Sequence, residues 1–207
     1  MKKFILSIVA VCLSVLVFAL VGCGGSVGKT EEEQFNEAKQ QFDNYTANIN
    51  MSVPALDFEM NTVLMIDGTK GKLTCQMSNS TEELVRYYEE RYGSVFKYDT
   101  EWVENSSDTI EEATAYYNGF IYVVSLFFYD DFEKQGDYLV AKDSALESYA
   151  NQYNLYGLSS IKIKLENGRI TTATAIANMY IFNLNGERAE ITYTFSNYGS
   201  TEVDLPA

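Results

Sequence analysis

The sequence has 207 residues, a formal charge of −14 and no histidine. The acidic balance excludes nucleic acid as a partner, because binding a polyanion requires a basic surface. The missing histidine removes the usual general base, the usual zinc ligand and the Ser-His-Asp triad, so we expect no enzyme, no cofactor and no metal; a glycosidase with two carboxylates is the catalytic alternative.

The first 22 residues have the layout of a bacterial lipoprotein signal peptide. Lys2 and Lys3 precede an apolar run from Phe4 to Val21, which is typical of an export signal. Because this run approaches the ~20 residues that span a bilayer, an uncleaved transmembrane anchor is the alternative. The order Leu-Val-Gly-Cys at positions 20–23, followed at once by two glycines, favours a lipobox instead.

The lipobox predicts cleavage after Gly22 and a diacylglycerol on the thiol of Cys23. Each buried CH₂ of an acyl chain contributes about 0.8 kcal/mol, so two or three chains hold a protein stably on a bilayer. We therefore predict a protein that is lipid-anchored at the extracytoplasmic face of the cell membrane. Residues 23–29 form the lipidated cysteine and a short leader, and residues 30–207 suit a single domain.

Cysteine usage leaves one thiol in the predicted domain. Cys12 leaves with the signal and Cys23 is acylated, so Cys75 has no partner for an intramolecular disulfide. Cys75 lies on the apolar side of an alternating segment, which predicts a buried structural thiol.

The domain begins with a helix followed by alternating strands. Thr30 and Glu33 form a capping box, and apolar side chains then recur at three- and four-residue steps. From Tyr45 the period changes to two, which is the spacing of a strand with one apolar face. The predicted strands are 45–53, 58–66 and 72–77, with a hairpin turn at Asp67-Gly68.

The middle of the chain gives weaker signals. For 82–91 we favour a strand over a helix, because Val85, Tyr87 and Tyr88 suit a sheet. The remaining segments are predicted as a strand at 94–103, a helix at 109–117, a buried strand or helix at 120–129, and a short strand at 138–141.

The C-terminal part returns to clear alternation. Ser144 and Glu147 form a second capping box, which opens a helix that runs to Tyr153 and ends near Gly157. Strands are predicted at 161–166, 169–183, 189–195 and 201–205, with turns at Asn167-Gly168 and Asn185-Gly186.

This order of features resembles the LolA/LppX-like lipoproteins of bacterial envelopes. The shared features are a lipobox, a short helix, a strand meander, the Tyr-rich segments 85–88 and 98–102, a capped helix, and the closing segment 191–199. The resemblance implies an α+β fold, a curved antiparallel β half-barrel with a few helices covering its concave face. It also implies transport of lipids or lipoproteins, or envelope sensing. Only Cys23 carries over residue by residue.

One apolar face of the predicted strands is a candidate site for a lipid or another apolar ligand. A half-barrel cannot fill its concave side with strand residues alone, so helices or a ligand must cover it. The alternative is that the same face is ordinary core. The candidate ligand-binding residues are Tyr45, Ile49, Met51, Phe58, Met60, Leu64, Tyr193 and Phe195.

Two further compositional features favour a rival function, a protein-binding sensor or assembly module. All 16 tyrosines follow the signal; they suit protein contact or sugar stacking, but are also good strand residues. Acidic residues cluster at 99–112 and 130–133 without the Asp-x-Asp-x-Asp-Gly spacing of a calcium loop, so we expect a solvated acidic rim.

Replacing Cys23 by Ser tests the predicted anchor. The variant should remain an unprocessed precursor that takes up no labelled palmitate, because the acyl acceptor is gone. Metabolic labelling followed by gel analysis measures this, and normal labelling of the variant would contradict the lipobox.

Overall fold

A computed structural model describes residues 28–119, 121, 124, 127–153, 157–180 and 184–207. The chain groups into two compact units, residues 1–31 and 32–207, and the second unit holds the strands. The predicted signal peptide, the lipobox and Cys23 lie outside the described residues.

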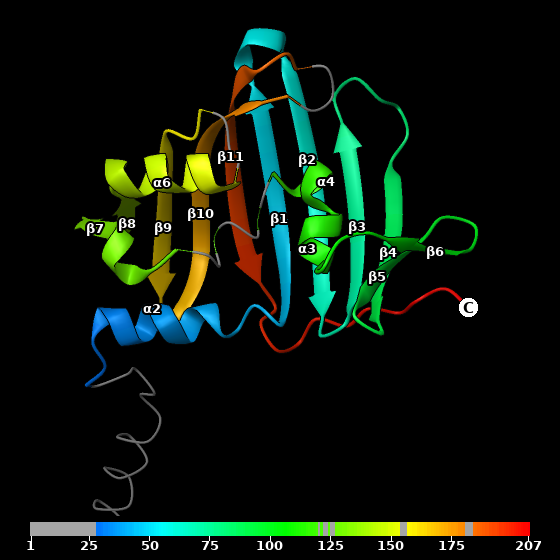
Figure 1. Ribbon diagram of the computed structural model, residues 1–207, viewed down its shortest axis with the longest axis horizontal. Coiled ribbons are helices and arrows are strands. Elements are labelled where there is room, and N and C mark those ends of the chain that lie inside the picture. Colours follow the sequence, from blue (N-terminus) through cyan, green and yellow to red (C-terminus); the bar gives the residue numbers. More distant parts are fainter. Residues whose placement is uncertain (1–27, 120, 122–123, 125–126, 154–156, 181–183) are drawn as a thin grey trace, which may run out of the picture. The chain divides into compact units, whose positions relative to one another are not determined.

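The described residues form one open, antiparallel, 11-stranded sheet (Figure 1). The chain starts at the centre with β1, moves outward to the edge strand β6, crosses to the opposite edge at β7, and returns to the centre, where β11 pairs with β1. The antiparallel meander predicted from the sequence is thus confirmed. The strands are β1 (Asn44–Val53), β2 (Phe58–Asp67), β3 (Lys70–Met77), β4 (Leu84–Arg91), β5 (Ser94–Tyr98), β6 (Trp102–Asn105), β7 (Phe132–Gln135), β8 (Tyr138–Ala141), β9 (Ser160–Glu166), β10 (Arg169–Met179) and β11 (Glu187–Ser196).

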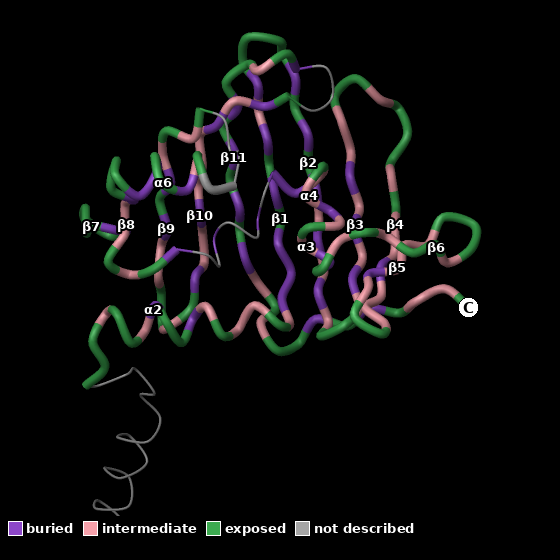
Figure 2. Tube along the Cα trace, in the orientation of Figure 1, coloured by how far each residue is buried: buried purple, intermediate pink, exposed green. Residues whose placement is uncertain are grey.

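The strands form because apolar and polar side chains alternate along them. In β1, Ile49 and Met51 are buried while Asn48 and Asn50 are exposed. Successive side chains of a strand point to opposite faces, so this period of two buries one face of the sheet. Figure 2 shows the alternation of buried and exposed positions along the central strands. We call the buried side the covered face and the other side the outer face.

Short helices accompany the sheet, and the described chain is mostly β. Helices α3 (Ile110–Ala113), α4 (Ala115–Asn118) and α6 (Asp143–Tyr153) lie over the covered face (Figure 1). Helix α2 (Glu31–Lys39) runs along one end of the strands, where the Phe35 ring lies 5.6 Å from that of Phe132 at the start of β7. Two 3-10 turns, Pro54–Leu56 and Tyr129–Asp131, complete the described elements.

Several predictions for the middle of the chain have clear outcomes. The strand favoured for 82–91 is confirmed as β4, and the helix predicted for 109–117 is confirmed as the pair α3 and α4. The strand predicted for 94–103 is instead two strands, β5 and β6, because the chain turns back where the Asp99 amide donates to Glu101 O at 3.3 Å. Strand β7 was not predicted, since Glu133, Lys134 and Gln135 are all exposed at the sheet edge.

The strand predicted for 201–205 is wrong. Both edges of β11 are already hydrogen-bonded, one to β1 and the other to β10. The segment that follows β11 therefore cannot pair with it as a further strand. Side chains bind its backbone instead: the Thr201 amide donates to Asn44 Oδ1 at 2.8 Å, and the Val203 amide donates to Asp67 Oδ2 at 3.3 Å. Asn44 Nδ2 also donates to Thr201 O at 3.0 Å and to Asp67 Oδ1 at 3.1 Å.

Replacing Asn44 by Ala tests this attachment of the C-terminal tail. The change leaves the backbone of Thr201, a buried residue, without its side-chain partners, and an unsatisfied buried group costs about 1–3 kcal/mol. We expect the free energy of unfolding in urea to fall by about that amount.

The control is Asn48→Ala on the same strand, where the side chain is exposed. Surface substitutions usually change stability by less than ~0.5 kcal/mol. Equal effects of the two substitutions would show that Asn44 does not hold the tail.

Candidate functional site

The structure places all eight candidate ligand-binding residues on the covered face of the three central strands. The register sets Ile49 beside Tyr193 and Met51 beside Met60, and it sets both Phe195 and Leu64 beside Ala47. Each of the eight is at most 5 % exposed. These side chains therefore pack against one another and against the covering elements, as the core of the domain does.

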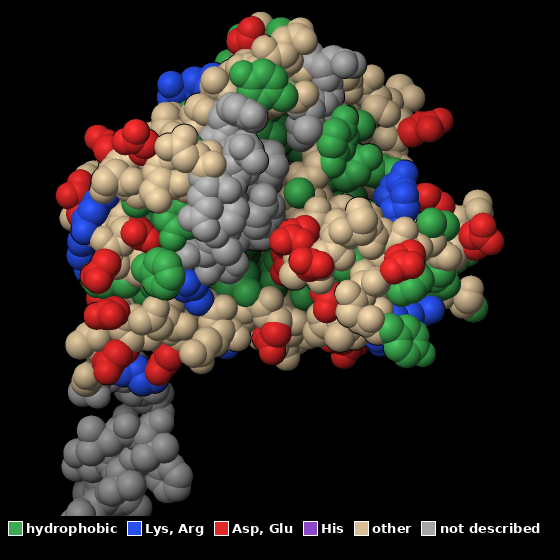
Figure 3. All heavy atoms as spheres, in the orientation of Figure 1, with side chains coloured by type: hydrophobic (Ala, Val, Ile, Leu, Met, Phe, Trp, Pro, Cys, Tyr) green, Lys and Arg blue, Asp and Glu red, His purple; other side chains and the backbone are tan. Residues whose placement is uncertain are grey.

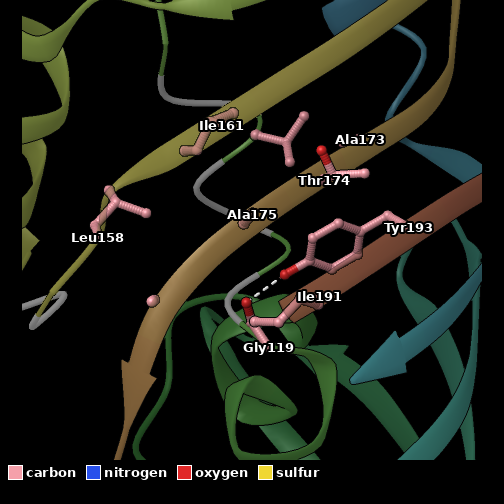
Figure 4. Close-up of a pocket in the computed structure, with 10 residues that line it drawn as sticks. Gly119, Leu158, Ile161, Ala173, Thr174, Ala175, Ile191 and Tyr193 are labelled. Atoms are coloured by element: carbon pink, nitrogen blue, oxygen red, sulfur yellow. Dashed lines mark hydrogen bonds between the residues drawn. The ribbon is translucent and has the colours of Figure 1, made fainter. Parts of the chain in front are cut away.

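An apolar cavity of the covered face, lined by described residues, lies to one side of this core, over β9, β10 and β11. Its volume is about 20 Å³, which is roughly the space that one water molecule needs. Figure 4 shows side chains of the three strands, among them Ile161, Ala173 and Tyr193, converging near Gly119. The lining residues are Gly119, Val124, Leu158, Ile161, Ala173, Thr174, Ala175, Ala177, Ile191 and Tyr193.

Of the candidate residues predicted from the sequence, only Tyr193 lines this cavity. The prediction missed the small residues of β10, which make room above the sheet. Ala173, Ala175 and Ala177 recur at every second position, so their methyl groups share one face of the strand. This stripe was visible in the sequence and is the signal that could have located the cavity.

A close contact joins Gly119, at the end of α4, to β11. The Tyr193 hydroxyl donates a hydrogen bond to the Gly119 carbonyl (Figure 4). Gly119 ends α4 with a φ of 60°, and a Cβ on it would lie 3.0 Å from the Tyr193 hydroxyl and 3.1 Å from Ile191. Glycine is therefore required both by the left-handed backbone and by the approach to the sheet.

Buried polar groups hold α3 and α4 in place. The side-chain nitrogen Nδ2 of Asn118 donates to Thr114 Oγ1 at 2.8 Å and to the Glu111 carbonyl at 2.7 Å. Thr62 of β2 donates to the Tyr117 carbonyl at 2.8 Å. Because buried polar groups need partners, these bonds fix the two short helices against the strand.

An acid lies at the edge of the core. Tyr45, which is fully buried, donates its hydroxyl proton to Glu111 Oε1 at 3.1 Å. Burial raises the pKa of the Glu111 carboxyl above its ordinary value of 4.5, although the bond from Tyr45 opposes the shift. Burial likewise raises the pKa of the Cys75 thiol, and the predicted buried cysteine is confirmed at 1 % exposure.

The covered face becomes charged toward β5. Arg86 lies 2.6 Å from Asp99, and Lys97 lies 3.0 Å from the other oxygen of that carboxylate. Beside them, burial raises the pKa of Tyr88 to about 12, while the positive charge of Arg86 opposes the shift. The centre of the face is thus apolar and its β4–β5 end carries an ion-paired cluster.

Acidic side chains gather over α3 and are scattered along the rim of the face in Figure 3. Among the described residues, no group of three or more Cys, Asp or Glu side chains could hold a metal ion. No helix in the described part of the chain is long and apolar enough to cross a membrane.

Comparison with known proteins gives no family. No protein-family model matches the sequence, and no curated protein matches it. The geometry of the chain itself is therefore what supports a function.

Replacing Glu111 by Gln tests the electrostatics of the covered face. The raised pKa means that the folded protein resists ionisation of this carboxyl, so the charged form destabilises the fold as pH rises through the folded pKa. We expect Glu111→Gln to increase the free energy of unfolding at pH 7. The gain should shrink toward pH 4.5 and vanish below it, where the wild-type carboxyl is protonated in both states.

Urea titrations at several pH values measure this difference, and Glu112→Gln is the matched control. Glu112 is exposed and neighbours Glu111 on the same helix. A stabilisation independent of pH, or one equal in both variants, would contradict the assignment.

Proposed function

We propose that the protein is a lipid-anchored lipoprotein of the bacterial envelope that acts without catalysis and binds a lipid or another apolar ligand on the covered face of its sheet. The observation that carries the proposal is the cavity over β10. Its walls are aliphatic and aromatic side chains around a stripe of alanines, and apolar walls with few polar groups are typical of small-molecule sites.

A ligand larger than water would have to move covering side chains. Among the described side chains that line the cavity, those of Val124 and Leu158 come from outside the strands. Both side chains are apolar, so an acyl chain that took their place would break no hydrogen bond of theirs. The aliphatic surface that they now bury would then be buried by the ligand.

The topology supports a LolA/LppX-like half-barrel as the form of this site. The sheet is open, its edges are β6 and β7, and α3, α4 and α6 lie on one face. Sheets of many strands twist and coil, so such a sheet would present a concave side to the helices. In this proposal the covered face is that concave side.

The proposed anchor would keep the site close to a source of acyl chains. The predicted lipobox would put the lipid on Cys23, only a few residues before α2 begins at Glu31. A leader of about six residues, 24–29, reaches only ~20 Å when fully extended. The domain would therefore stay near the membrane surface.

Protein binding is the second candidate function. It is favoured by large apolar side chains that the covering elements expose, Tyr116 at 45 % and Phe128 at 68 %. Exposed aromatic side chains of this size are enriched at protein interfaces.

Native mass spectrometry of a soluble version that begins at Gly24, purified without detergent, tests the ligand. We expect a co-purifying acyl species in the wild type and its loss in Ala175→Leu, whose added side chain would fill the cavity. Titration with a fluorescent fatty acid should show binding at least tenfold weaker in that variant. Overpacking costs about 1–3 kcal/mol, so a cooperative thermal transition must first show that the variant is folded.

The matched control is Thr172→Leu on the same strand. Thr172 pairs with Thr194 on the outer face, so a leucine at this position adds a similar bulk on the side of the sheet opposite the cavity. Loss of the ligand in both variants would contradict the proposed site. A wild-type protein with no acyl species and no fatty-acid binding would leave protein binding as the better function.

A further inference from the structure

The outer face of the β4–β6 end carries a strip of aromatic rings that the apolar-ligand site does not use. The register pairs Tyr87 with Tyr98 and Tyr98 with Trp102, so their side chains share one face across three strands. Phe96 lies on the same face, two positions from Tyr98. The Tyr98 and Trp102 rings are 5.4 Å apart, edge to face. We call these four residues the aromatic strip.

The strip is on the side opposite the core. Tyr88 and Val95, which neighbour Tyr87 and Phe96 in the sequence, are at most 1 % exposed on the covered face. The four strip residues are instead partly exposed, and no described helix lies on their side of the sheet. The four rings therefore lie on the surface of the domain and do not pack in its core.

Cationic side chains border the rings. The Arg91 guanidinium lies 4.8 Å from the Trp102 ring centre and 5.8 Å from that of Phe96, and it is paired with Glu89. The Lys72 ammonium lies 5.6 Å from the Tyr87 ring centre. These contacts hold the rings in place and put hydrogen-bond donors beside them.

A polar hollow adjoins the strip. Its volume is about 350 Å³, and Glu104, directly opposite Phe96 in the register, belongs to its wall. Hydroxyl, amide and carboxylate groups can all exchange hydrogen bonds with the hydroxyls of a sugar. The polar lining comprises Ser94, Glu104, Asn105, Ser106, Ser107 and Asp108.

The charge of the strip restricts its partner. By register, the charged side chains on the outer face of β3–β6 are Lys70, Lys72 and Arg91 against Glu89 and Glu104, which nearly cancel. The chain as a whole carries −14. An anionic polymer would be repelled by the acidic body, and a cationic one would be drawn to the rest of the surface. A nearly neutral strip fits an uncharged partner.

We propose that the aromatic strip and the adjoining hollow bind a linear, uncharged glycan. Aromatic faces carry negative charge density, which attracts the polarised C–H groups on the face of a pyranose ring. Rings in a row across three strands would meet successive sugars, and the hollow would receive their hydroxyls. This site lies on the outer face, so its occupation does not depend on a ligand at the covered face.

The only tryptophan of the chain, Trp102, belongs to the strip and reports on binding directly. The full-length protein is titrated with chitohexaose, and separately with cellohexaose, in a zwitterionic detergent that lacks a sugar headgroup. We expect a saturable change of tryptophan fluorescence with at least one of the two, and none with the anionic polymer polygalacturonate. Binding to the active oligosaccharide should be about tenfold weaker in Tyr98→Ala, the loss expected for one aromatic contact.

Tyr138→Ala is the matched control. Tyr138 pairs with Lys164 on β9 and is 40 % exposed, so it is an exposed strand tyrosine far across the sheet, and its removal should leave the affinity unchanged. Phe96→Ala provides a second strip variant if Tyr98→Ala does not show a cooperative melt. The proposal is overturned if neither oligosaccharide changes the fluorescence, or if Tyr98→Ala and Tyr138→Ala bind the oligosaccharide equally well. It is also overturned if Tyr98→Ala loses the binding of a protein partner but keeps the binding of the oligosaccharide.

Discussion

The pairing of β1 with β11 is the constraint on which the rest of the structure depends. Each of these strands is the inner end of one meander, β1–β6 and β7–β11. Without their ladder, from Thr46 beside Ser196 to Ser52 beside Glu190, the chain would form two smaller sheets with two more open edges, and exposed edges invite aggregation. Beside this ladder, Thr46 of β1 and Thr201 of the C-terminal tail, 155 positions apart, share a hydrogen bond between their hydroxyls.

This pairing requires the chain to cross the sheet once. Because the meanders meet at the centre, β6 and β7 lie at opposite edges, and the chain between them must cross the sheet. The crossing carries α3 and α4, and the apolar side chains of Ile110, Ile121, Val124 and Phe127 along it are buried. The face they cross is the covered face, and both the cavity over β10 and the bond from Tyr193 to Gly119 lie on it.

The sequence predicts the strands well where burial is one-sided. The alternation in β1, β2, β3 and β9–β11 is a local signal, and each of these strands was located. Strand β7 was not predicted, because Glu133, Lys134 and Gln135 are all exposed at the sheet edge and the strand has no alternation of apolar and polar residues. The strand predicted at 201–205 was wrong for the opposite reason. Thr201 and Val203 are buried and alternate with exposed residues, as in a strand. Their backbone, however, is bound by the side chains of Asn44 and Asp67 and not by a neighbouring strand.

The candidate site was less predictable, because its geometry depends on contacts between distant segments. The apolar residues chosen from the sequence are those that fill the core best, whereas space remains where side chains are small, beside Ala173, Ala175 and Ala177. Size, and not hydrophobicity, is therefore the informative property for a cavity on such a sheet.

Alternation also explains how one strand can serve two faces with different chemistry. In β4, Tyr88 is buried in the core while Tyr87 pairs with Tyr98 in the aromatic strip. Adjacent side chains point to opposite faces, so a change at one position leaves the other face largely intact. Additivity holds for residues that share no partner, which makes the proposed apolar site and the proposed glycan site separable by substitution within a single domain.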